Sequence, residues 1–114
     1  MSGPTKPDHM PITDRRQLVE ELELGCKPAD QYKIGTEHEK FVFCNKNRKP
    51  AAYDGEKGIR TILTELQGIS GWKPIMEGEH IIGLTGDGAS VSLEPGGQLE
   101  LSGAPLATIH QTCS

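Results

Sequence analysis

Aromatic residues and long apolar segments are scarce in this sequence. Its 114 residues include one Trp, two Tyr and two Phe, and a single domain of this size buries only a modest core. We therefore expect the chain to be part of something larger. No apolar run approaches the roughly 20 residues of a membrane-spanning helix, and residues 1–11 lack the basic and apolar regions of a secretory signal. These absences predict a cytoplasmic protein without membrane contact.

Basic clusters and cysteine motifs are also missing. The net charge is -4, and Lys and Arg are not clustered, which argues against a nucleic-acid partner. The cysteines, Cys26, Cys44 and Cys113, are odd in number and widely spaced, so we predict reduced thiols rather than a secreted disulfide scaffold or a Cys-x-x-Cys motif. A zinc site completed by His38 or His110 is the weaker alternative, because no spacing matches a structural zinc pattern.

The N-terminal part of the chain changes from a polar arm to a helix. Residues 1–12 are polar, with three prolines before Ile12, and predict a disordered arm. Thr13 or Asp14 can cap the helix that follows, and Gly25 can end it in the left-handed conformation. The side chains expected on one face of this helix are Leu18, Val19 and Leu22.

Two further helices are predicted downstream. Asp54 can cap the second helix, and Gly68 can end it. The third begins at Ala104 with Pro105 in its first turn. The apolar stripe of the second helix follows the i, i+3, i+4, i+7 rule and consists of Ile59, Ile62, Leu63 and Leu66.

Alternating and turn-rich segments predict an antiparallel sheet. A first strand is expected over 32–43, and short strands follow Trp72. Thr85–Gly88 is a hairpin turn signal, and Pro95–Gly97 is a second tight connection. The later strands are expected at 73–76, 80–84, 89–94 and 98–102. With helices outside the sheet, the predicted fold class is α+β.

The alternation of side chains assigns four glutamates to faces of the predicted strands. Alternation places Glu37 and Glu39 beside Phe41 and Phe43, so this face is expected to point inward. On the strand expected at 89–94, Ser90, Ser92 and Glu94 share a face, and on the strand expected at 98–102, Gln98, Glu100 and Ser102 do. The residues expected on the opposite, buried face are Val91, Leu93, Leu99 and Leu101.

Carboxylates in an apolar context require a neutralising cation. A strand pairing that brings Glu94 and Glu100 beside Glu37 and Glu39 would create a floor suited to Mg²⁺ or Mn²⁺, with ATP as the phosphate-bearing co-substrate. The alternative is that Glu37 and Glu39 lie on an ordinary solvated face, and that the same is true of Glu94 and Glu100.

Two other features carry competing readings. The simplest interpretation of Gly96 and Gly97 is that they are turn residues. They could also let the backbone approach a phosphate, although neither they nor their neighbours match a P-loop or a dinucleotide fingerprint. His38 lies on the face opposite the glutamates, which favours a structural or hydrogen-bonding role over acid-base catalysis.

With these residues in view, the sequence resembles the N-terminal part of glutamate-cysteine ligases of the plant and proteobacterial type. The resemblance covers residues 12–114. The matching segments are Gly25–Pro28, Ile34–Phe41, Met76–Gly78, Ile81–Leu84 and Ser92–Cys113.

The resemblance implies a reaction and a fold. The reaction is the ATP-dependent joining of the γ-carboxylate of glutamate to the amino group of cysteine through a γ-glutamyl phosphate, the first step of glutathione biosynthesis. The fold resembles the catalytic domain of glutamine synthetase, a curved antiparallel sheet with outer helices and with metal and nucleotide on its concave face. Glutamate, cysteine and ATP are the implied small-molecule partners.

The resemblance also assigns residues. Glu37, Glu39, Glu94 and Glu100 match the acidic positions that hold magnesium, and no catalytic residue separate from these ligands is implied. Residues 13–114 would be the N-terminal part of a ligase catalytic domain, truncated at its C-terminus. The remainder of that domain is then a partner, and we expect the fragment alone to be inactive.

Location, redox state and the exact reaction follow less directly. In plant members a cysteine matching Cys113 joins a redox-sensitive disulfide, whereas the lack of a plastid transit sequence favours a cytoplasmic bacterial enzyme with a thiol there. Two alternative functions stay open. One is a γ-glutamyl ligase for another amine or thiol pathway, and the other is a non-catalytic module that binds metal and nucleotide.

Overall fold

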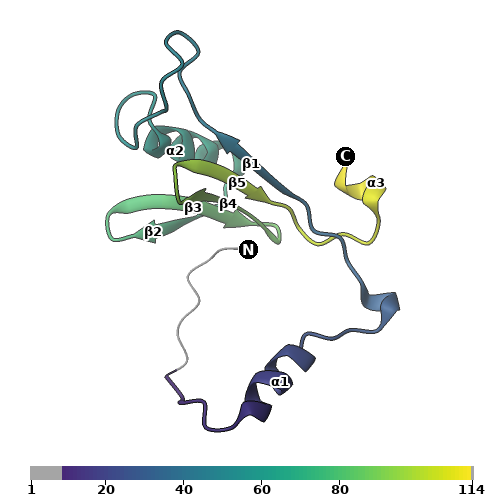
Figure 1. Cartoon of the computed structure of the whole chain (residues 1–114). Coiled ribbons are helices and arrows are strands. Elements are labelled where there is room, and N and C mark those ends of the chain that lie inside the picture. Colours follow the sequence, from purple (N-terminus) through teal and green to yellow (C-terminus); the bar gives the residue numbers. More distant parts are fainter. Residues whose placement is uncertain (1–8, 114) are drawn as a thin grey trace.

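A five-stranded antiparallel sheet forms the centre of the molecule (Figure 1). The computed structural model describes residues 9–113. The sheet order is β1-β5-β4-β3-β2, so the last four strands form a meander and β1 joins it beside β5. This arrangement confirms the predicted α+β class. The strands are β1 (Glu37–Phe41), β2 (Lys73–Glu77), β3 (His80–Gly86), β4 (Ala89–Glu94) and β5 (Gln98–Ser102).

The two predicted connections of the meander are present. Asp87 and Gly88 both have positive φ, 53° and 75°, which is the signature of a type I′ hairpin turn. Gly96 and Gly97, with φ of 90° and 81°, turn the chain between β4 and β5. Residues without a side chain adopt such left-handed conformations at little cost, which explains why glycine occupies these positions.

Helix α2 (Ile59–Ser70) covers one face of the sheet and, within the described residues, supplies two of the four buried hydrophobic residues of the core. Its buried Ile59 and Leu63 pack with Ile81 and Leu84 of β3, so the predicted apolar stripe lies against the sheet as expected. The partly buried residues around this cluster are Val42, Ala51, Tyr53, Leu66, Trp72, Val91, Leu93 and Leu99.

The predicted ends of α2 are wrong. The N-cap is Gly58, because the Asp54 carboxylate instead accepts a 2.8 Å hydrogen bond from Arg60 Nε. The helix also continues past Gly68 to Ser70 and ends where Gly71 takes a left-handed φ of 70°. An isolated glycine inside a helix is tolerated when packing holds the helix together.

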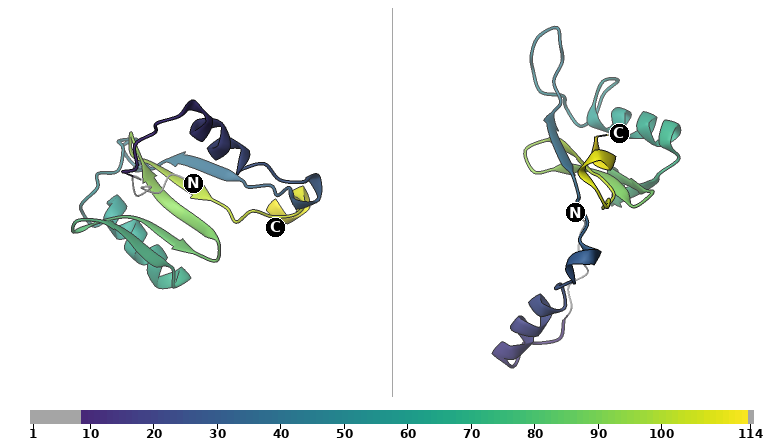
Figure 2. Two further views of the ribbon diagram at one scale, coloured as in Figure 1. Left: turned by 90° about the horizontal axis from the view of Figure 1, so that it is seen from below. Right: turned by 90° about the vertical axis from the view of Figure 1, so that its right-hand side faces the viewer.

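Helix α1 (Arg15–Glu23) lies apart from the sheet, as Figure 1 and the right-hand view of Figure 2 show. Asp14 caps it as predicted and forms a capping box with Gln17. The predicted left-handed end at Gly25 is wrong, because Leu24 closes the helix in a right-handed conformation and Gly25 is not among the positive-φ glycines. A short 3-10 helix, η1 (Ala29–Gln31), follows.

The predicted strand over 32–43 is shorter in the structure, and the last helix begins later. Isolated bridges pair Ile34 with Leu106 and Phe43 with Pro50 on either side of β1. Because the first bridge keeps the chain extended beyond Pro105, α3 (Ile109–Thr112) begins after an N-cap at Thr108 rather than at Ala104.

The remaining expectations concern the N-terminal arm and the membrane. The predicted arm over residues 1–12 falls mainly on residues 1–8, which lie outside the described residues. Residues 9–12 have no helix or strand. In the part of the chain that the structure describes, no helix is both long enough and apolar enough to cross a bilayer.

Candidate functional site

The strand register brings all four predicted glutamates to the face of the sheet opposite α2. Glu39 lies directly opposite Glu100, and Glu37 lies opposite Ser102. On the other side of β5, Glu94 lies opposite Gln98. Directly paired residues share a face, and the intervening Val91, Leu93 and Leu99 pack toward the core. The predicted grouping of these faces is therefore confirmed at the level of the backbone, but Leu101, which was expected to be buried, is 41% exposed.

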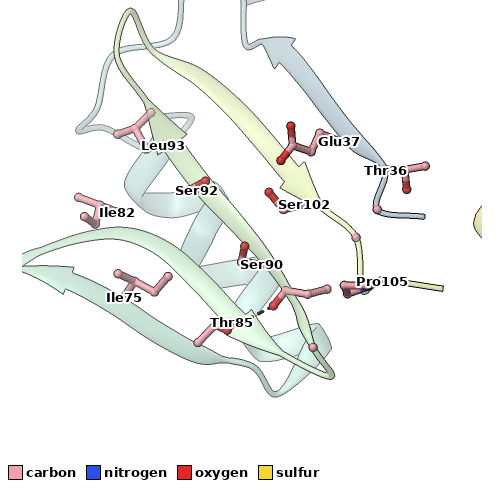
Figure 3. A pocket seen from close by; sticks show the side chains of 14 residues that line it. Thr36, Glu37, Ile75, Ile82, Thr85, Ser90, Ser92, Leu93, Ser102 and Pro105 are labelled. Atoms are coloured by element: carbon pink, nitrogen blue, oxygen red, sulfur yellow. Dashed lines mark hydrogen bonds between the residues drawn. The ribbon is translucent and has the colours of Figure 1, made fainter. Parts of the chain in front are cut away.

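A hollow of about 660 Å³ opens on this face. Figure 3 shows hydroxyl side chains of β4 and β5 pointing into it, with apolar side chains on the β2 and β3 side. Of the four glutamates, Glu37 lines it directly. The other labelled lining residues are Thr36, Ile75, Ile82, Thr85, Ser90, Ser92, Leu93, Ser102 and Pro105, of which Leu93 also packs against the core cluster.

A register shift in the β2-β3 pair creates the apolar wall. Ile75 pairs with Gly83, but the next residue, Met76, pairs with Ile81, so Ile82 has no partner in this register. An unpaired extra residue reverses the alternation of side chains along a strand. Ile82 therefore joins Ile75 at the hollow, while Ile81 and Leu84, which are three residues apart, both belong to the core.

The glutamates differ sharply in burial and in hydrogen bonding. Glu100 is only 6% exposed, Glu94 is half-buried, and Glu37 and Glu39 are exposed. Ser102 Oγ donates a 2.7 Å hydrogen bond to Glu100 Oε1, and Ser92 Oγ donates a 2.8 Å bond to Glu94 Oε1. The sequence places these serines on the correct face, and their i, i+2 spacing from a glutamate is the signal for the hydrogen bonds that sequence reasoning missed.

Placement on one face does not by itself gather the carboxylates at one point. Across residues 9–113, no group of three His, Cys, Asp or Glu side chains is arranged to hold a metal ion. The structure thus brings Glu39 and Glu100 together as a facing pair, with Glu37 and Glu94 on the same face but farther along the sheet. The role of these glutamates as metal ligands remains a prediction.

The predicted burial of two aromatic side chains is wrong. Phe41 and Phe43 were expected to be buried, but they are 68% and 46% exposed. The reason is that α2 packs on the other face, where Val42 contacts the core. His38 pairs with Leu101 in the register and lies on that same opposite face, as its alternation predicts.

Gly96 and Gly97 lie at the exposed tip of the β4-β5 connection. Gly97 N–H donates to the backbone oxygen of Glu94 at 3.1 Å, and a Cβ on either glycine would meet no atom within 4 Å. Their positive φ accounts for glycine at both positions through the turn alone. A role in binding phosphate stays a prediction.

The cysteines are separate from this face of the sheet. Cys26 and Cys113 are exposed and Cys44 is half-buried, each as a free thiol. Backbone N–H groups of Lys46 and Asn47 donate toward the Cys44 sulfur and lower the pKa of that thiol. Among the described residues, no zinc-type group of cysteines and histidines occurs.

Comparison with known proteins identifies close relatives. The model of glutamate-cysteine ligase family 2 (GCS2) matches residues 33–114. The chain is 50% identical over 104 residues to the chloroplastic glutamate-cysteine ligase of Arabidopsis thaliana, covering 91% of this chain and 19% of that protein. Over the same length it is 50% identical to glutamate-cysteine ligase A of Oryza sativa subsp. japonica and 48% identical to the enzyme of Brassica juncea, covering 20% of each.

These matches correct one expectation and confirm another. The predicted bacterial, cytoplasmic origin is wrong, because the curated relatives are plant proteins whose names place them in the chloroplast. That prediction relied on a missing transit sequence, and a chain that spans about a fifth of the length of its relatives gives no information about a leader. The resemblance noted from the glutamate segments is confirmed, and the chain belongs to glutamate-cysteine ligase family 2.

Proposed function

We propose that this chain forms one wall of the metal and nucleotide site of an ATP-dependent ligase that joins the γ-carboxylate of glutamate to the amino group of cysteine. Two findings support the proposal. One is membership of the family, and the other is the facing pair Glu39 and Glu100, with Glu37 and Glu94 on the same open face. The facing pair is the observation on which the proposal mainly rests.

The donor chemistry of this face fits magnesium or manganese. These ions take oxygen ligands, and magnesium commonly combines one or two carboxylates with water and substrate phosphates. Neither Glu39 nor Glu100 has an ion-pair partner among residues 9–113, so a cation would relieve two negative charges held opposite one another. When bound, the ion would screen the triphosphate and favour transfer of its terminal phosphoryl group to the γ-carboxylate.

The rest of the proposed site would come from outside these residues. We propose that the sheet is part of a larger curved sheet of the glutamine synthetase type, and its open, hollowed face supports that reading. The remainder of the catalytic domain would then bring further groups to glutamate, cysteine and ATP. Gly96 and Gly97 are the proposed approach point for a phosphate on this wall. We expect the 114 residues alone to form no product.

The test uses the protein expressed from its complete reading frame, with glutamate, cysteine, ATP and Mg²⁺. Formation of γ-glutamylcysteine is followed by mass spectrometry for the wild type and for Glu39→Gln and Glu100→Gln. We expect each substitution to reduce kcat on the order of 10²-fold or more, the scale seen when a transition-state charge stabiliser is removed. Glu65→Gln, an exposed glutamate on α2, is the matched control and should leave the rate unchanged.

Other outcomes point to the alternatives. If an amine other than cysteine is the best acceptor in a panel, the chain belongs to a γ-glutamyl ligase of another pathway. If the protein binds Mg²⁺ and ATP but forms no product with any amine, it is a binding module. Full activity in both glutamate variants would refute the proposed role of this face.

A further inference from the structure

Two serine-glutamate pairs repeat on neighbouring strands of the glutamate face. On β4 the serine precedes the glutamate by two residues, as Ser92 and Glu94, and on β5 it follows by two, as Ser102 and Glu100. In each pair the serine hydroxyl donates to Oε1 of the glutamate, at 2.8 Å and 2.7 Å. Because β4 and β5 are antiparallel, this reversed order means that the direction from serine to glutamate is the same in both pairs.

The register defines that direction. Ser102 lies in the row of Glu37, and Glu100 lies in the next row, that of Glu39. Ser92 lies opposite Glu100 in that second row, and Glu94 lies one row farther on. Each hydroxyl therefore reaches its carboxylate from the same end of the sheet. In each glutamate Oε1 is engaged by the hydroxyl, and Oε2 is left for another partner.

Burial makes the β5 pair the more rigid of the two. Glu100 and Ser102 are 6% and 8% exposed, so little water competes for their hydrogen bond. Glu94 and Ser92 are half-buried. A glutamate side chain has several rotatable bonds, and a hydrogen bond in a buried position selects one arrangement of them before any ligand arrives.

We propose that Ser102 and Ser92 are positioning residues that hold Glu100 and Glu94 for a divalent cation, with Ser102 the more important. The inference rests on the proposed metal function of this face. Groups that orient a metal-binding carboxylate through a hydrogen bond raise affinity because the ligand is already placed, and their removal typically weakens metal binding about 10- to 100-fold.

The test is Mn²⁺ binding, measured by electron paramagnetic resonance on the protein expressed from its complete reading frame, in the presence of ATP. We expect Ser102→Ala to weaken Mn²⁺ binding about 10-fold and Ser92→Ala to weaken it less. Ser102→Thr keeps the hydroxyl and should keep the wild-type affinity. The matched control is Ser90→Ala, because Ser90 lies opposite Ser102 and lines the same hollow but donates to no glutamate in the described residues.

The outcomes separate this inference from the proposed function. If the wild type binds Mn²⁺ and Ser102→Ala binds it as tightly as Ser90→Ala, the positioning role is refuted while the metal site stands. If the wild type binds no Mn²⁺, the proposed metal site is refuted and the inference falls with it. Circular dichroism checks that each variant is folded. Should Ser102→Ala unfold, Ser92→Ala becomes the test, because Ser92 is only half-buried. An unchanged Mn²⁺ affinity in that variant overturns the inference.

Discussion

Replacing Glu100 by glutamine should stabilise the protein in the absence of metal. The variant should also lose the stabilisation that a bound metal ion gives to the wild type. Glu100 is buried and directly opposite Glu39. At a separation of about 6 Å and an effective dielectric constant of about 20, Coulomb's law gives a repulsion of about 2.8 kcal/mol. Because Glu39 is exposed, solvent and salt reduce this value, and we expect a gain of about 1 kcal/mol in the free energy of unfolding. The amide oxygen of glutamine can still accept the hydrogen bond from Ser102.

A divalent cation should reverse the order of stability. A ligand that binds only the folded state adds about 2.7 kcal/mol when its concentration is 100 times its dissociation constant. The wild type should therefore gain about 2.7 kcal/mol at such a Mn²⁺ concentration, whereas Glu100→Gln should gain little. The variant that is about 1 kcal/mol more stable without metal then becomes about 1.7 kcal/mol less stable with it.

The assay is urea unfolding followed by circular dichroism, with EDTA in one series and Mn²⁺ in the other. Glu65→Gln on the exposed side of α2 is the control and should behave like the wild type in both series. A Glu100→Gln variant that is less stable than the wild type in EDTA would refute the repulsion argument. Equal stabilisation of both proteins by Mn²⁺ would refute a role for Glu100 in metal binding.

Further predictions concern a core leucine, two glycines and the Cys44 thiol. Leu63→Ala, at a fully buried position, should lower the free energy of unfolding by about 2–5 kcal/mol in urea. Gly86→Ala should lower it by about 1–3 kcal/mol, because the new Cβ would lie 2.4 Å from Trp72 Cδ1; Gly68→Ala, where a Cβ meets nothing within 4 Å, should instead raise it by up to about 1 kcal/mol. Cys44 should react with iodoacetamide with a midpoint below the ordinary thiol pKa of 9.0, because backbone N–H groups stabilise its thiolate; a midpoint at or above that value in a pH-rate profile would contradict this.

Local patterns were sufficient for the meander and for the existence of α2. The strands after Trp72 agree with their predicted ranges to within two residues, because alternation and positive-φ turn residues are encoded in adjacent positions. The same periodicity placed all four glutamates on the correct faces. A period-two pattern fixes which residues share a face even when the pairing partner is unknown.

Contacts outside the helix and strand patterns decided the features that sequence reasoning missed. Asp54 has the side chain of a helix cap, but Arg60 takes its carboxylate. Pro105 is suited to the first turn of a helix, yet the bridge between Ile34 and Leu106 keeps the backbone extended past it. Phe41 is exposed because α2 selects the other face of the sheet. The last two outcomes depend on a residue distant in sequence or on a layer whose position no local pattern specifies, whereas the first depends on a competing side chain only six residues away.

The uneven burial of the facing glutamates bears on how the proposed site would work. Glu100 is held by Ser102 in a buried position, whereas Glu39 is exposed on the edge strand β1. A cation between them would meet one carboxylate that is already placed and one that can move. The fixed ligand would set the position of the ion, and the mobile ligand would adjust as phosphate oxygens replace water around it. Although both substitutions should lower kcat, substituting Glu100 should weaken metal binding even without nucleotide, whereas substituting Glu39 should weaken it mainly when ATP is bound.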